Sequence, residues 1–141
     1  MDFSVFFTIN YLAVVVAAGV YFMMGSVWYS GLFGRAWLAE LKKHNVTIHA
    51  PSTAQLRNKM IIAFVLNFIT AVAVAWLVKM TESTTAMSGL MLGIVITIGF
   101  AATTIASMFN WEGRSVKLFL IDIGYPALGI IASAILLSVW Q

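Results

Sequence analysis

Four long stretches of the chain carry almost no charge, and they restrict the fold more than any other feature. Residues 3–34, 60–78 and 83–111 contain no Asp, Glu, Lys or Arg, and residues 118–141 contain only Asp122. A helix needs about 20 apolar residues to cross a hydrocarbon core of about 30 Å. The sequence therefore predicts four transmembrane helices, over about residues 6–29, 60–78, 86–108 and 118–139.

The composition agrees with a chain that lies mostly in lipid. Of the 141 residues, 62% are hydrophobic and only 9% are charged, whereas about a quarter are charged in an average soluble domain. We expect an all-α fold, an integral membrane four-helix bundle that forms a single membrane domain over residues 1–141. The start, M-D-F-S-V-F-F, lacks the basic residues of a signal peptide, which indicates a retained first span. The chain has no cysteine, so disulfides and thiolate metal sites are excluded.

The basic residues predict the orientation in the membrane. Seven of the eight Lys and Arg residues lie in the loop 30–59 or between the third and fourth spans. Basic residues favour the cytoplasmic side, so both termini are expected outside the cell (N-out, C-out), in the inner or plasma membrane. This topology explains the net charge of +3 without a nucleic-acid partner. Membrane lipids are the partners that we expect for the basic residues.

The loop 30–59 is longer than a simple connection requires. Its first part, G-L-F-G-R-A-W-L-A-E-L-K-K, places apolar residues at helical spacing and leaves Glu40 and the basic residues for the other face. This pattern predicts an amphipathic helix lying in the cytoplasmic interface. Ser52 and Gln55 have the spacing of a capping box, so the second helix is expected to begin near Ser52. Membrane-interface positions are assigned to Trp28, Tyr29, Phe33, Arg35, Trp37 and Trp111.

Small residues recur at helical spacing on the third and fourth spans. Such residues let membrane helices approach closely, which replaces the missing hydrophobic drive for association. Four helices bury few residues fully, so we expect some of these positions to face another subunit of a homo-oligomer. The predicted packing positions are Gly89, Gly93, Thr97, Ala101, Gly129 and Ser133.

Asp122 is the one charge inside a predicted span, and it defines the candidate site. Asp122 and Tyr125 are three residues apart on one face of the last span, and Asn67 and Thr104 lie at comparable depth. Pro126 lacks the amide that would bond to the Asp122 carbonyl, so a bend is expected there. These residues predict a proton or cation site that opens to the cytoplasm. The alternative is a structural Asp that forms a hydrogen bond to a neighbouring helix.

Two hypotheses for the function follow. The first is an oligomeric channel or transporter for protons, cations or small solutes, with a polar cavity around Asp122. The second is a scaffold or accessory subunit that binds lipid or another membrane protein. No paired nucleophile and base, phosphate-binding loop or metal-ligand cluster is evident in the sequence, and His44 and His49 alone are a weak metal site. We expect no enzyme activity, no metal and no cofactor.

Three motifs together resemble a known family. They are N-Y-L-A-V-V-V-A-A near the start, G-S-V-W-Y-S-G-L-F-G-R-A-W after the first span, and E-G-R-S-V-K-L-F-L-I-D-I-G-Y at the last span. The chain is similar, over nearly its whole length, to the domain of unknown function 1761 family, small bacterial and fungal membrane proteins with about four spans. The resemblance implies a standalone membrane protein with no assigned activity, and it implies no catalytic residues.

Overall fold

The computed structural model describes residues 3–46 and 48–141, and its regular structure there is helical. Four helical stretches are long and apolar enough to cross a membrane, over Tyr11–Leu32, Thr53–Met80, Ala86–Glu112 and Val116–Val139. They confirm the four long apolar helices expected from the uncharged stretches, and their crossing of a membrane stays a prediction. In order, the elements are the 3-10 helix η1 (Phe3–Thr8), α1 (Tyr11–Ser26), the π-helical η2 (Val27–Leu32), α2 (Gly34–Lys43), α3 (Thr53–Met80), α4 (Ala86–Ile96), the π-helical η3 (Thr97–Ala102), α5 (Thr103–Glu112) and α6 (Val116–Val139).

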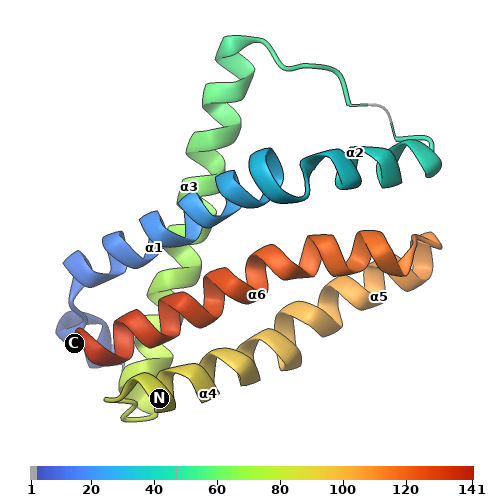
Figure 1. Cartoon of the computed structure of the whole chain (residues 1–141). Coiled ribbons are helices and arrows are strands. Elements are labelled where there is room, and N and C mark those ends of the chain that lie inside the picture. Colours follow the sequence, from blue (N-terminus) through green and yellow to red (C-terminus); the bar gives the residue numbers. More distant parts are fainter. Residues whose placement is uncertain (1–2, 47) are drawn as a thin grey trace.

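Helix α6 forms the centre of the arrangement. The segment α1–η2–α2 lies along one side of α6 and the segment α4–η3–α5 along the other, and both run opposite to α6 (Figure 1). Helix α3 crosses this layer steeply, and its first half stands clear of the other helices (Figure 1). Both ends of the chain and the α3–α4 turn lie at one end of the molecule, while the α5–α6 turn lies at the opposite end (Figure 1).

The core lies where α1, α3 and α6 meet. Alanines dominate the α1 face, which lets the helix axes approach closely. Because these side chains are small, the aromatic ring of Tyr21, only 5% exposed, fills the space toward α6. The buried hydrophobic residues of this cluster are Ile9, Ala13, Val14, Ala17, Ala18, Tyr21, Ala71, Val74, Ala75, Val78, Ile130, Ala134 and Leu137.

Local sequence signals fix the start of α3 and the end of α5. Ser52 accepts from the Gln55 amide, and the Gln55 side chain accepts from the Ser52 amide, which confirms the predicted capping box at the start of α3. Helix α5 ends at Gly113, whose φ of 62° lies in the left-handed region that favours glycine. Arg114 and Glu112 form an ion pair across this turn.

Helices α4 and α6 are in contact through glycines. A Cβ atom on Gly89 would lie 2.6 Å from the Ala134 carbonyl oxygen, and one on Gly93 would lie 2.8 Å from the Ile131 Cα. On α6 itself, a Cβ atom on Gly129 would lie 2.0 Å from the Tyr21 ring. These three predicted packing positions therefore form contacts within one chain.

The other predicted packing positions are also turned inward to differing degrees. Thr97 is 6% exposed and Ser133 is fully buried, while Ala101 is half-buried. The hydroxyls of Thr97 and Ser133 have no hydrogen-bond partner within the part of the chain that the structure describes. A role of this set in joining subunits stays a prediction.

Helix α2 occupies the place of the predicted amphipathic helix and packs against the first turns of α6. The expectation that Glu40 lies on a solvated face is wrong, since Glu40 is only 2% exposed. Its carboxylate faces the start of α6, where partners offset the cost of burial. The location of α2 in a membrane interface, and the N-out, C-out orientation, stay predictions.

Candidate functional site

Three aromatic side chains from the segment between η2 and α2 donate hydrogen bonds to α6. The Trp37 Nε1 donates to Asp122 Oδ1 at 2.8 Å, and the Tyr29 hydroxyl donates to the same oxygen at 3.2 Å. The Trp28 Nε1 donates to the Ile121 carbonyl at 2.9 Å. Two consecutive residues of α6 are thus held by three side chains from residues 28–37.

The local backbone explains how neighbouring residues reach α6 together. Trp28 and Tyr29 are consecutive, and they lie in the π-helical turn η2, where the backbone is wound more loosely than in an α-helix. On the α6 side, Gly124 leaves room, because a Cβ atom there would lie 2.3 Å from the Trp28 ring. The Tyr29 and Trp37 rings pack edge to face with centroids 5.2 Å apart, which fixes both donors.

A second polar pair connects α6 to α3. The Asn67 Nδ2 donates to the Tyr125 hydroxyl at 2.9 Å, and that hydroxyl donates to Asn67 Oδ1 at 3.1 Å. The Tyr125 ring lies between two other tyrosines, with centroid distances of 5.1 Å to Tyr21 and 5.8 Å to Tyr29. Gly25 of α1 makes space for Tyr125, since a Cβ atom there would lie 2.7 Å from the ring.

Asp122 itself is half-buried inside α6. It follows the first residue of the helix by six positions, or about 9 Å along the axis. Its hydrogen-bond donors, Tyr29 and Trp37, are both neutral. Within residues 3–46 and 48–141, no cationic side chain comes within ion-pair distance of the carboxylate. The site is therefore an acid inside a long apolar helix, and its charge, when present, has no paired cation among the described residues.

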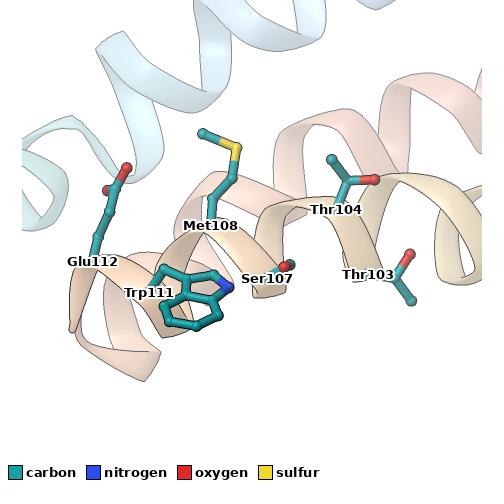
Figure 2. A pocket seen from close by; sticks show the side chains of 6 residues that line it. All are labelled: Thr103, Thr104, Ser107, Met108, Trp111 and Glu112. Atoms are coloured by element: carbon teal, nitrogen blue, oxygen red, sulfur yellow. The ribbon is translucent and has the colours of Figure 1, made fainter.

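The structure separates Thr104 from the other predicted site residues. Thr104 lines an open cavity of about 620 Å³ on the surface of α5, together with Thr103, Ser107, Met108, Trp111 and Glu112. All six side chains belong to this one helix (Figure 2). Asp122, Tyr125 and Asn67 do share one region, but Asn67 and Tyr125 are bonded to each other and not to the carboxylate.

A second charged cluster lies where α2 meets the start of α6, and we name Glu40, Lys43, His44, Ser115 and Lys117 the α2–α6 latch. Glu40 Oε1 pairs with Lys43 at 2.8 Å and with Lys117 at 3.4 Å, and Oε2 accepts from the Ser115 hydroxyl at 3.0 Å. The Ser115 amide donates to His44 Nε2 at 3.1 Å. Ser115 is also the N-cap of α6.

The latch shifts the acidity of its carboxylate. Hydrogen bonds from Lys43 and then Ser115 lower the pKa of Glu40 from 4.5 to about 2. Glu40 is covered by lysine side chains that are themselves 67% and 63% exposed. The lowered pKa therefore arises from the hydrogen-bond donors in contact with the Glu40 carboxylate, which lie near water, and not from burial deep in the protein.

Sequence reasoning missed the partners of Asp122. Trp28, Tyr29 and Trp37 are assigned above to the membrane interface, and the structure adds hydrogen bonds from all three to α6. The motif W-Y-S-G-L-F-G-R-A-W contains all three residues, but nothing in it distinguishes a hydrogen bond to another helix from a place among lipid headgroups. Phe33 packs on Trp28 with centroids 4.3 Å apart, while Arg35 is exposed and Trp111 is 86% exposed. Interfacial roles for these six stay predictions.

The chain is similar to known proteins at the level of a family. No curated protein and no solved structure matches the chain. One family model matches residues 12–138, which is nearly the whole chain. The match includes η2, α2 and all of α6 but its last residue, and so the residues that surround Asp122. With its four long apolar helices, this protein belongs to the family described as "Protein of unknown function (DUF1761)".

Proposed function

We propose that this protein is a small membrane transporter or channel that takes up and releases a proton at Asp122. The single observation that carries the proposal is an acid inside α6 that is bonded by two neutral donors and paired with no cation among the described residues. An ionisable residue within a span is costly to keep, and such residues commonly mark ion or proton pathways. A structural role alone would be met by a neutral Asn at the same position.

The donor set favours a proton over a metal cation. The Tyr29 hydroxyl and the Trp37 Nε1 both direct hydrogens at Asp122 Oδ1. These hydrogens occupy the Oδ1 lone pairs, so a metal ion would find only Oδ2 on this carboxylate, and one oxygen is far fewer than the six or so that a hard cation takes. A proton requires only Oδ2, which accepts no hydrogen bond within the described chain. Proton binding at Oδ2 therefore leaves the aromatic donors in place.

Proton exchange would change how α2 is held on α6. Hydrogen bonds to a charged acceptor are roughly twice as strong as those between neutral groups. Loading a proton on Asp122 would thus weaken the bonds from Tyr29 and Trp37, which come from η2 and α2. The adjoining π-helical turn would serve as the hinge, because such turns often mark functional sites in helices. The segment η2–α2 is the element expected to move.

Reconstitution into vesicles tests the proposal. Vesicles loaded with a pH-sensitive dye and placed in an imposed potential should show proton flux with wild-type protein, and Asp122→Asn should reduce that flux at least tenfold. Glu112→Gln serves as the matched control, because Glu112 is an exposed carboxylate on α5 and should leave the flux unchanged. Wild-type vesicles as tight as empty ones, or full flux in Asp122→Asn, would overturn the proposal.

The first half of α3 favours a second candidate, an accessory subunit that binds another membrane protein. Residues 51–62 are all exposed, and large apolar side chains of this half-helix such as Ile61, Ile62 and Leu66 are 55%, 58% and 58% exposed. A stoichiometric partner that co-purifies with the wild type, and is lost when Ile62 and Leu66 are changed to Ala, would support this candidate. A homogeneous preparation with proton flux would exclude it.

A further inference from the structure

Two apolar cavities meet at the Trp28 ring. One, of about 370 Å³, lies between α1–η2 and α6 and is lined by Val20, Met23, Met24, Val27, Trp28, Leu32 and Leu128. The other, also about 370 Å³, lies between η2–α2 and the first turns of α6 and is lined by Trp28, Phe33, Ala36, Lys117, Leu120 and Ile121. Both are separate from the Asp122 carboxylate, which lines neither of them.

The α6 residues of the two cavities lie along one face. Lys117, Leu120, Gly124 and Leu128 follow helical spacing, so they lie one above another. The Trp28 ring covers Gly124 at the midpoint, where a Cβ atom would be only 2.3 Å from the ring. The two cavities therefore lie one after the other along this face of α6, on either side of the Trp28 ring. We name the pair, from Lys117 to Leu128, the Trp28 groove.

The length of the Trp28 groove matches one lipid tail. Eleven residues separate Lys117 from Leu128, which is about 16 Å at the rise of an α-helix. One leaflet of a bilayer has a hydrocarbon thickness of about 15 Å, half of the whole core. The walls face outward, since Met23, Leu32 and Leu120 are 67%, 65% and 59% exposed. Flexible methionine side chains can adapt to an acyl chain, which has no fixed shape.

The charge at one end of the groove specifies the headgroup. Lys117 and Lys43 share a single carboxylate, Glu40, so this end of the groove keeps one net positive charge. The Lys117 side chain is 63% exposed and can pair with a second anion. Arg35, which is exposed, precedes the groove residue Ala36. A zwitterionic headgroup would not neutralise this excess, whereas an anionic phosphodiester would.

We infer that the Trp28 groove binds one anionic phospholipid, with its phosphate at Lys117 and an acyl chain extending past Trp28 to Leu128. Neither part of the site depends on proton exchange at Asp122. The lipid would cover the outer side of the contact between η2–α2 and α6. Its binding would thus stabilise the position of α2 that the latch also stabilises.

Competition between lipids tests the inference. Full-length protein in mild detergent is given equal amounts of phosphatidylglycerol and phosphatidylcholine with identical tails, and native mass spectrometry counts the bound lipids. One lysine near an anionic headgroup favours binding about fivefold, so wild type should retain phosphatidylglycerol by at least that ratio. Lys117→Gln should bring the ratio near one, while the Lys43–Glu40 pair stays in place.

Two further variants keep the test decisive. Lys59→Gln, at an exposed lysine of α3 that lines neither cavity, should keep the wild-type ratio. Ala36→Leu should lower retention of both lipids, because the added side chain fills the groove. Equal retention of the two lipids by wild type, or equal losses in Lys117→Gln and Lys59→Gln, would overturn the inference. So would a disulfide-linked dimer formed by Leu128→Cys in this cysteine-free chain, since a second copy would then occupy the groove.

Discussion

At the scale of single residues, Asp122 Oδ1 accepts from both Trp37 and Tyr29. Hydrogen bonds between membrane helices contribute about 0.6 kcal/mol on average and up to about 1.7 kcal/mol. Trp37→Phe and Tyr29→Phe should each lower the free energy of unfolding in detergent by an amount in this range. Because the two donors share one acceptor, the double variant should depart from additivity.

Trp111→Phe is the control for these two variants. Trp111 is 86% exposed, so its replacement should leave the free energy of unfolding unchanged within about 0.5 kcal/mol. If Trp37→Phe and Tyr29→Phe were as stable as Trp111→Phe, the bonds to Asp122 would contribute nothing to the fold.

The importance of Asp122 could be predicted from sequence, but its partners could not. A lone acid in an apolar stretch stands out because its cost in lipid is large. A Trp or Tyr near a helix end, however, gives the same sequence pattern whether its side chain lies among lipid headgroups or donates a hydrogen bond to a neighbouring helix. Only the backbone of η2, which has no distinct sequence signal, determines that Trp28 and Tyr29 both reach α6.

At the scale of elements, the contact of α4 with α6 depends on the absence of a side chain at Gly93. A Cβ atom there would lie 2.8 Å from the Ile131 Cα, so the helix axes must separate. Gly93→Ala should lower the free energy of unfolding by about 1–3 kcal/mol, measured by chemical denaturation in detergent.

Gly19→Ala on α1 is the matched control, because a Cβ atom there would contact nothing within 4 Å. That variant should be neutral or stabilising by up to about 1 kcal/mol, since alanine restricts the unfolded chain. Equal destabilisation of both variants would show that backbone freedom, and not close packing, explains the effect at Gly93.

The α2–α6 latch should respond to acid. The pKa of Glu40 is lowered from 4.5 to about 2 in the folded state by Lys43 and Ser115, so the unfolded state binds the proton more readily. The stabilisation from Glu40 is thus fully present above pH 4.5 and is lost as the pH falls through about 2. Spin labels at Leu38→Cys and Leu120→Cys should keep a fixed distance near neutral pH and show a broader distribution in acid.

Glu40→Gln tests the origin of this response. The amide cannot pair with Lys43 and Lys117 as the carboxylate does, so the label distance should already be broad at neutral pH and should change little in acid. An acid transition that persists in Glu40→Gln would assign the response to another group.

The four long apolar helices could be predicted from the sequence, because an uncharged stretch of about 20 residues has the length and hydrophobicity of a membrane helix. The capping box of α3 could also be predicted from the sequence, since Ser52 and Gln55 interact over only three residues. The orientation of Glu40 could not be predicted. An amphipathic pattern assigns charged residues to water, whereas Ser115 and Lys117, which are distant in sequence, determine where this carboxylate lies.

At the scale of the whole molecule, the path of the chain predicts which loops share a side of the membrane. The α3–α4 turn lies at the same end as both termini, and the α5–α6 turn lies at the opposite end (Figure 1). Single cysteines at Thr84 and Gln141 should therefore react with an impermeant maleimide from one side, and a cysteine at Arg114 only from the other. The absence of native cysteines makes this labelling specific. Reaction of Thr84→Cys and Arg114→Cys from the same side would contradict the fold.

The basic residues add a direction to this arrangement. They predict that Thr84 and Gln141 are labelled in intact cells, while Arg114→Cys is labelled only after the membrane is opened. The reverse pattern would leave the fold intact but invert its orientation.

The π-helical turn Val27–Leu32 makes the protein sensitive to the number of residues before α2. Each residue advances an α-helix by about 100°. A π-helical turn holds one residue more than the α-helix it interrupts, so deleting the exposed Ser30 would let this turn rewind as ordinary α-helix while the residues after it keep their direction. An added residue at the same place would instead rotate Trp37 and Glu40 off α6 together, by about 100°. A one-residue insertion here should therefore do more harm than a one-residue deletion.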